Sequence, residues 1–181
     1  MASIAPDRQV PDEAGLVKVM FRFRPRAGWL PYDTEGLWAR PVTVETARIQ
    51  SAPFLQDGIA EGDVVRFTTD NTGVRWAVER VQASGNCTIR VLPLPNGPLG
   101  RNAGAVHEQF AGFGLGGESF NEEFPFVALT VPADADLAAI KALLQSGTSL
   151  GWWAFEVGCA TDAWRDARTR KVGSDEGRDA A

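Results

Sequence analysis

The chain has 181 residues, of which 44% are hydrophobic and 23% charged, a composition typical of one folded domain or two small subdomains. A formal net charge of −5 argues against a general nucleic-acid binder, and no apolar run is long enough for a membrane-spanning helix. One histidine and two cysteines exclude a multi-histidine metal centre, a disulfide framework and a cysteine-built zinc site.

The two ends of the chain are rich in polar and charged residues and show no periodicity. We therefore expect disordered tails at residues 1–14 and 161–181. The start of the chain lacks the pattern of a secretory signal, so we expect a cytoplasmic protein that needs no cofactor and no metal. Residues 1–90 hold 11 basic and 11 acidic residues, whereas residues 91–181 hold 7 and 12, so the C-terminal half carries the net negative charge.

The first half of the chain reads as short strands separated by turn signals. Apolar and polar residues alternate over 17–24, which is typical of a half-buried strand. A second strand region spans 36–50 and is interrupted by Pro41, and 64–69 and 74–82 form a predicted hairpin. A further strand covers 88–94. These strands predict a small antiparallel β-barrel, of the SH3 or OB kind, over residues 15–86.

The second half alternates helices with strands. Helical spacing predicts helices at 102–113 and 135–145, the second closed by Gly147, and strands at 118–123, 124–131 and 152–157. From residue 88 the order is β-α-β-β-α-β, which predicts a ferredoxin-like α+β subdomain over residues 87–160. The 88–94 strand is expected to belong to both subdomains or to bridge them.

Two glycine motifs resemble functional loops but lie in the wrong context. Residues 112–117 match G-x-G-x-x-G, yet they follow a predicted helix and precede a strand, whereas a dinucleotide loop leads from a strand into a helix. Residues 147–151 match the G-x-S-x-G nucleophile elbow, but they also lead from a helix to a strand. We interpret both as ordinary connections.

The histidine and the two cysteines are candidates for acid–base or nucleophilic chemistry. His107 lies on the apolar face of a predicted helix, where a mostly buried structural histidine is the plainer interpretation. Cys87 and Cys159 lie in or beside strands, and we expect small buried hydrophobic residues. Cys87 and His107 form the only nucleophile–base pair of their type in the sequence, so a catalytic dyad stays open.

The cations and tryptophans of the first half suggest binding surfaces. Lys18, Arg22 and Arg24 would project from one strand face, either as a solvated face or as an anion or RNA stripe. Trp29 and Trp38 bracket a polar segment that contains Glu35, and their rings either plug one end of the barrel or line a contact site. We expect Trp76 and one of Trp152 and Trp153 in the core.

A series of short motifs resembles the bacterial family catalogued as domain of unknown function 4265. The resemblance covers residues 16–160 and rests on Lys18-Val19-x-Phe21, Trp29, Glu35-x-Leu37-Trp38-Ala39, Pro53-Phe54, Gly62-Asp63-Val64-Val65, Ser84-Gly85-Asn86-x-Thr88-x-Arg90, residues 132–137 and Trp153-x-Phe155-Glu156-x-Gly158-Cys159. The family pattern has a serine at the position of Cys87 and a shorter glycine stretch near 112–117. The resemblance implies a fold outline and supplies no catalytic residue.

Three functional hypotheses follow. The first is a non-enzymatic binding module that recognises a protein or peptide through Trp29, Glu35, Trp38, Asn86 and Arg90. The second is a small cofactor-free enzyme or small-molecule-binding protein, with Glu35 or His107 as acid–base and Arg90 holding an anionic group in a cleft of several hundred Å³. The third is an RNA- or ribosome-binding module that uses Lys18, Arg22 and Arg24. We expect neither membrane association nor general nucleic-acid binding.

Overall fold

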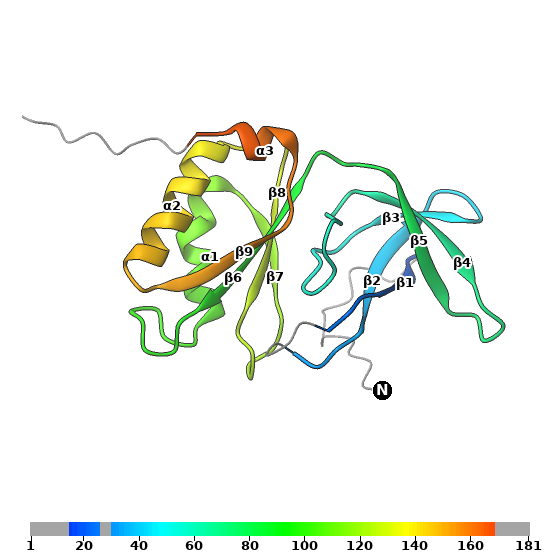
Figure 1. The fold of residues 1–181 in the computed structure, drawn as a ribbon, viewed down its shortest axis with the longest axis horizontal. Helices are drawn as coiled ribbons and strands as arrows, with labels where there is room; N and C mark the ends of the chain where they lie inside the picture. The colour runs from blue at the N-terminus through cyan, green and yellow to red at the C-terminus, as the bar shows by residue number, and fades with distance from the viewer. Residues whose placement is uncertain (1–14, 26–29, 169–181) are drawn as a thin grey trace, which may run out of the picture.

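The computed structural model describes residues 15–25 and 30–168 as three layers: a β-barrel, a four-stranded sheet and a pair of helices (Figure 1). In chain order the elements are β1 (Val17–Arg22), β2 (Thr34–Pro41), β3 (Thr46–Ile49), β4 (Val64–Thr69), β5 (Arg75–Gln82), β6 (Cys87–Pro93), α1 (Ala103–Phe110), a 3₁₀ turn (Ala111–Phe113), β7 (Gly116–Ser119), β8 (Val127–Val131), α2 (Leu137–Ser149), β9 (Trp153–Cys159) and α3 (Asp162–Asp166). The α+β class is confirmed.

The barrel consists of strands β1 to β5 in sequence order. Successive strands pair antiparallel, and β1 closes the barrel against β5 through a short parallel pairing at Val19 and Met20. The expectation of a purely antiparallel barrel is therefore wrong, because closing five strands brings β1 and β5 together in the same direction. Pro41 ends β2 and divides the predicted 36–50 region into two strands.

Alternation along the strands builds the barrel core. Inward-facing apolar side chains fill the interior: Val19, Phe21, Leu37, Ala39, Ala47, Ile49, Ile59, Val65 and Phe67. On β5 the pairing slips twice, so that two residues each time oppose one residue of β4. The extra residues are Val78 and Val81, and both are exposed. Bulges of this kind bend a strand and increase its local twist.

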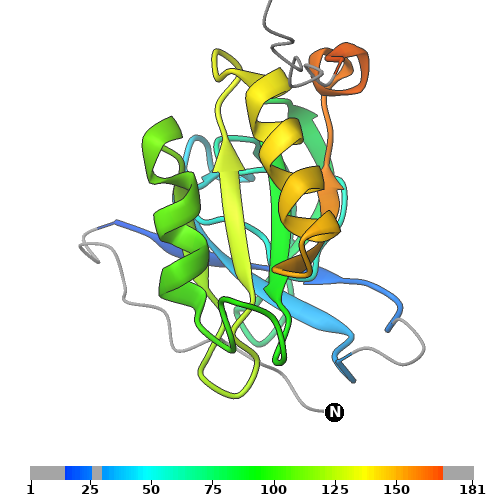
Figure 2. The same ribbon diagram turned by 90° about the vertical axis from the view of Figure 1, so that its left-hand side faces the viewer.

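The second layer is an antiparallel sheet with the strand order β7-β8-β6-β9. Helices α1 and α2 cover one of its faces, as Figure 2 shows from the helix side. Between them lies the largest core cluster, which includes Ile89, Val106, Phe110, Leu144 and Trp153. The chain order from β6 onward is β-α-β-β-α-β, as expected.

The predicted end of the second helix is corrected by the structure. The helix continues through Gly147 to Ser149, and Gly147 is buried inside it. A Cβ atom at this position would overlap the indole of Trp153, which lies flat against the helix backbone and donates its Nε1 hydrogen to the Leu144 carbonyl. Gly147 therefore serves close packing rather than helix termination.

The segment after β9 also differs from expectation. Residues 162–166 form the short helix α3, capped by the Thr161 hydroxyl, and Trp164 packs into the core beneath the helices. Ordered structure thus continues past residue 161, where a tail was expected. The other residues assigned to tails, 1–14 and 169–181, lie outside the described part of the chain.

The opposite face of the sheet packs against the barrel side of the molecule. Phe120 and Phe126 meet Phe54, which comes from the loop after β3, with ring centroids 5.2–5.4 Å apart. The loop of residues 51–57, called the junction loop below, lies between the two layers. No helix in residues 15–25 and 30–168 is long and apolar enough to cross a bilayer.

Candidate functional site

The junction loop is held by two buried charged side chains, one from each layer. Glu35 on β2 is 2% exposed, and its carboxylate accepts hydrogen bonds from the backbone N–H groups of Phe54, Leu55 and Gln56 at 2.8–3.0 Å. Arg90 on β6 is also 2% exposed. The two residues that the sequence singled out therefore reach the same short segment from opposite sides.

The guanidinium of Arg90 hydrogen-bonds to the junction loop and to a residue of its own sheet. Its guanidinium donates to the carbonyls of Pro53 and Gln56 and pairs with the carboxylates of Asp57, at 2.8 Å, and Glu156, at 2.7 Å. Gly158 on β9 leaves the space in which the guanidinium lies, since a Cβ there would be 2.7 Å from Arg90 Cζ. Arg90 and Glu35, which the sequence proposed as ligand or partner contacts, are thus positioning residues of the junction loop.

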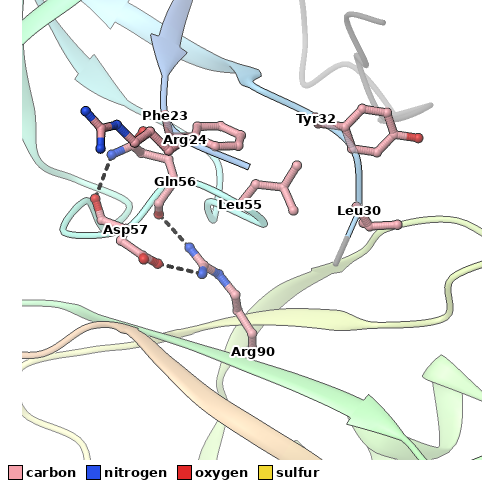
Figure 3. A pocket seen from close by; sticks show the side chains of 8 residues that line it. All are labelled: Phe23, Arg24, Leu30, Tyr32, Leu55, Gln56, Asp57 and Arg90. Atoms are coloured by element: carbon pink, nitrogen blue, oxygen red, sulfur yellow. Dashed lines mark hydrogen bonds and ion pairs between the residues drawn. The ribbon is translucent and has the colours of Figure 1, made fainter. Parts of the chain in front are cut away.

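A cavity of about 90 Å³ lies beside the junction loop (Figure 3). Its lining comes from the segments just after β1 and just before β2, from the junction loop and from β6: Phe23, Arg24, Leu30, Tyr32, Leu55, Gln56, Asp57 and Arg90. The cavity is smaller than the cleft of several hundred Å³ expected for an enzyme. Glu35 is not among its described lining residues, because its carboxylate is engaged by the loop backbone.

His107 lies on the other side of the sheet. It belongs to α1, is partly buried, and its Nε2 is 3.3 Å from the Ser119 hydroxyl. Burial lowers the pKa of His107 below its ordinary value, which favours the neutral imidazole. The acid–base group expected to work with Glu35 and Arg90 is therefore separated from them by the sheet.

The two cysteines are free and buried, as expected. Cys87 lies 3.5 Å from the Thr161 hydroxyl, and Cys159 lies 3.7 Å from Nη1 of Arg80. Burial raises the pKa of the Cys159 thiol. Cys87 and His107 make their hydrogen bonds to different partners, so the described structure forms no hydrogen-bonded dyad. Among residues 15–25 and 30–168, no group of three His, Cys, Asp or Glu side chains could hold a metal ion.

Asn86 is part of the connection between barrel and sheet. Its side-chain amide donates to the Glu61 carbonyl at 2.9 Å, and the neighbouring Ser84 donates through its backbone and hydroxyl to the buried Asp63. Arg80 completes this cluster by pairing with Asp63 at 3.3 Å. Asn86 is not a described lining residue of the Arg90 cavity, and Trp29 lies outside the described residues.

A second surface lies on the outside of the barrel, where β1 crosses between β2 and β5. Its outward side chains are Lys18, Met20, Arg22, Trp38 and Trp76, and we call this surface the tryptophan face. Lys18 is paired opposite Trp38 and Met20 opposite Trp76. The Lys18 ammonium lies 4.8 Å from the Trp38 ring and the Arg22 guanidinium 3.8 Å from the Trp76 ring.

Trp76 is held in one orientation. Its Nε1 donates to Asp70 at 2.8 Å, and Asp70 also accepts from the Thr72 hydroxyl and from the backbone of the β4–β5 turn. These bonds, above all those from Thr72 and Trp76, hold the pKa of Asp70 far below its ordinary value. A groove of about 800 Å³ runs beside the fixed indole, lined by Met20, Arg22, Phe23, Asp33, Thr34, Val74 and Trp76.

Trp76 lies on the outside of the barrel, and the expectation that it belongs to the core is wrong. On β5 the neighbouring Ala77 packs against the barrel core, so Trp76 lies on the opposite, outer side of the strand. Of the predicted cationic stripe, Lys18 and Arg22 share the tryptophan face, whereas Arg24 lines the cavity beside the junction loop. Trp153 is fully buried, as expected for one of the Trp152–Trp153 pair.

The comparisons with known proteins agree with this fold. One solved structure, described as a novel crystal structure of a hypothetical protein from Neisseria gonorrhoeae, is similar with a TM-score of 0.65 and 15% sequence identity, over 78% of this chain and 93% of that one. No curated protein matches the chain. A family model described as a domain of unknown function (DUF4265) matches residues 35–155, and on this match the chain belongs to that family.

Proposed function

We propose that the protein is a non-enzymatic binding module that recognises a protein or peptide segment through the tryptophan face. The observation that carries this proposal is the fixed Trp76 indole beside an open groove of about 800 Å³. Aromatic anchors that lose little side-chain freedom on binding are typical hot spots of protein interfaces. Arg22 lies over the indole, and the N–H groups at the edge of its guanidinium can donate to partner carbonyls or carboxylates.

The shape of the surface supports an extended ligand. Gly36 on β2 has no side chain to keep Lys18 and Met20 away from the strand. A Cβ atom at this position would lie 2.8 Å from Met20 Sδ and 2.9 Å from Lys18 Cδ, so these two side chains lie flat across β2. The surface between Trp38 and Trp76 is therefore formed by aliphatic and aromatic groups, with the charged ends of Lys18 and Arg22 at its edges. Such a mixture suits an extended peptide with apolar and acidic or carbonyl groups.

Selection from a peptide library displayed on phage tests this proposal. Peptides enriched on the wild-type protein should bind about tenfold or more weakly to Arg22→Ala and Trp38→Leu, measured by fluorescence anisotropy. Arg165→Ala is the matched control, because Arg165 is an exposed arginine with one surface ion pair, on the remote helix α3. Equal binding by all four proteins, or no enrichment at all, contradicts the proposal.

A second candidate is RNA, favoured by the two cation–aromatic pairs on one strand face. Aromatic rings beside cations form the stacking platforms of many single-strand binders. The net charge of −5 weakens this alternative. Titration of a labelled single-stranded RNA separates the two: RNA binding would fall steeply between about 50 and 200 mM salt, and salt-independent or absent binding excludes it.

We further infer that the barrel is of the SH3 or OB kind and that the C-terminal layer is ferredoxin-like. The five-stranded closed barrel supports the first assignment and the chain order from β6 to β9 the second. We also propose a cytoplasmic location, where the two buried thiols would stay reduced.

A further inference from the structure

We propose that the cavity beside the junction loop binds a primary ammonium group carried on a short alkyl chain, at a site separate from the tryptophan face. The cavity of about 90 Å³ has a polar floor, formed by Gln56, Asp57 and Arg90, and apolar walls (Figure 3). Its size matches a few non-hydrogen atoms, such as the end of a lysine side chain, rather than a metabolite with several rings.

The first argument is an acceptor that lacks a donor. Gln56 Oε1 is a buried oxygen with no hydrogen-bond partner, whereas such atoms in proteins are nearly always paired. The amide cannot be turned to relieve this, because its Nε2 donates to the Asp57 carbonyl at 2.7 Å and the reversed amide would set two oxygens against each other. Both backbone groups of Gln56 are engaged as well, by Glu35 and Arg90. Gln56 Oε1 is therefore available to accept a hydrogen bond from a ligand.

The second argument is the sign of the charge around this oxygen. Arg90 is the buried cation of the site, and it is already paired with two carboxylates, those of Asp57 and Glu156. An anionic ligand would meet the Asp57 carboxylate and the Gln56 oxygen, both of which repel it. An ammonium group donates to the oxygen and gains from the nearby carboxylates. Two cations oppose it among the described lining residues: Arg90, whose charge is offset by its two carboxylate partners, and the exposed Arg24 on the rim.

The third argument is the chemistry of the walls. Phe23, Leu30, Tyr32 and Leu55 give the cavity apolar sides, and Leu30 is almost fully buried. An alkyl chain of about four carbons covers such walls while its charged end stays at the polar floor, which is the way lysine side chains commonly bury. The site therefore fits a lysine side chain of a partner or a small free alkylamine, two sources with the same chemistry.

The test uses n-butylammonium chloride and NMR of the full chain. The backbone amide signals of residues 55–57 should shift in a saturable way, and butan-1-ol and butyrate, of the same length, should bind at least about tenfold more weakly. A shift that does not saturate below about 50 mM, or equal binding of butyrate, overturns the proposal. In a crystal soaked with the amine, its nitrogen should lie within hydrogen-bond distance of Gln56 Oε1, and an ordered water alone at that place overturns it too.

Variants tie the binding to the orphaned oxygen. Gln56→Met keeps the volume and removes the acceptor, so affinity should fall about tenfold or more. Gln50→Met is the matched control: Gln50 is another half-buried glutamine that donates only to nearby backbone, and the change should leave binding intact. If Gln56→Met does not fold, Gln56→Ala decides, since it also removes the acceptor without setting an oxygen against the Asp57 carbonyl, and unchanged affinity contradicts the site.

The ammonium site and the tryptophan face can fail separately. Peptides selected on the tryptophan face should bind Gln56→Met as they bind the wild type, because Gln56 lines the cavity and not the groove beside Trp76, and Phe23 is the one described residue that the two share. A lysine-containing peptide that binds only through Gln56 would support the lysine source, and butylammonium binding without it would support the free amine.

Discussion

Glu35 shows how one buried carboxylate can fix a loop. It replaces water for three consecutive N–H groups, those of Phe54, Leu55 and Gln56, and each bond to a charged acceptor is worth more than a neutral one. Glu35→Gln keeps the shape but sets an NH₂ group against these donors. We expect the free energy of unfolding to fall by about 2–4 kcal/mol, measured by urea denaturation. Glu45→Gln, at an exposed position, should change it little, and an equal effect of both changes would contradict this role.

The effect of burial on the pKa of His107 can be measured directly, because His107 is the only histidine in the chain. Burial places its pKa below 6.5 in the folded protein, so the neutral form is favoured by folding. The contribution of His107 to stability is complete above pH 6.5 and is lost as the pH falls through the folded pKa. An NMR titration of the imidazole should give a midpoint below that of the urea-unfolded chain. A folded midpoint at or above 6.5 would contradict the buried environment.

Gly147 sets helix propensity against packing. Alanine would favour the α2 helix by up to about 1 kcal/mol, but its Cβ would overlap the Trp153 ring. Overpacking of a dense core costs about 1–3 kcal/mol and should win, so Gly147→Ala should lower the midpoint of urea denaturation. Ser146→Ala, one residue earlier and exposed, should leave it equal or raise it. A stabilised Gly147→Ala protein would mean that Trp153 can move aside.

At the scale of elements, periodicity and turn signals predicted most strands and helices, because each depends on neighbours in the sequence. The 64–69 strand coincides with β4, and the alternation over 17–24 contains β1. Features that depend on distant residues were missed: the parallel closure of β1 on β5, the outward side of Trp76 on β5, and the continuation of α2 through Gly147. A glycine that stops one helix can sit inside another, and only the packed ring of Trp153 decides which.

In the candidate site too, the sequence indicated some residues, but not the contacts that they make with distant parts of the chain. The sequence singled out Glu35, in the polar segment between Trp29 and Trp38, and Arg90 as contact residues, and in the structure both bind the junction loop. Their role could not be predicted, because it depends on backbone groups of the loop after β3, which no side-chain pattern marks. Gln56 carries no sequence signal at all. The doubly buried β6 segment around Arg90 is the one hint that its charge would be met inside the molecule.

Hydrogen bonds within the β4–β5 turn fix the orientation of Trp76 on the surface. Hydrogen bonds from Thr72 and Trp76 lower the pKa of Asp70 in the folded protein. The ionised carboxylate therefore stabilises the fold at pH values above its unfolded pKa, near 4, and this stabilisation is lost as the pH falls below that value. Asp70→Asn should lower the urea midpoint at pH 7, and the gap from the wild type should narrow at pH 3. The variant should also bind tryptophan-face peptides more weakly. A gap that is constant with pH would contradict the ionised role of Asp70.

At the scale of the whole molecule, Arg90 connects the two layers. Its bonds join β6 and β9 of the sheet to the junction loop, whose N–H groups are held in turn by Glu35 of the barrel. Arg90→Met removes this connection and leaves two loop carbonyls without donors. Because Asp57 and Glu156 are partly exposed and can be rehydrated, we expect a loss of about 2–4 kcal/mol rather than the full cost of a broken buried pair.

The loss should also be local before it is global. In hydrogen–deuterium exchange, the amides of Phe54, Leu55 and Gln56 should exchange at least about tenfold faster in Arg90→Met, whereas α2, on the far face of the sheet, should keep its protection. Arg165→Met should change neither. Faster exchange in α2 as well would mean that Arg90 stabilises the sheet itself, and unchanged exchange in the junction loop would mean that Glu35 holds the loop alone. The joined arrangement matters for both proposed sites, since the junction loop forms the floor of the ammonium cavity and the barrel carries the tryptophan face.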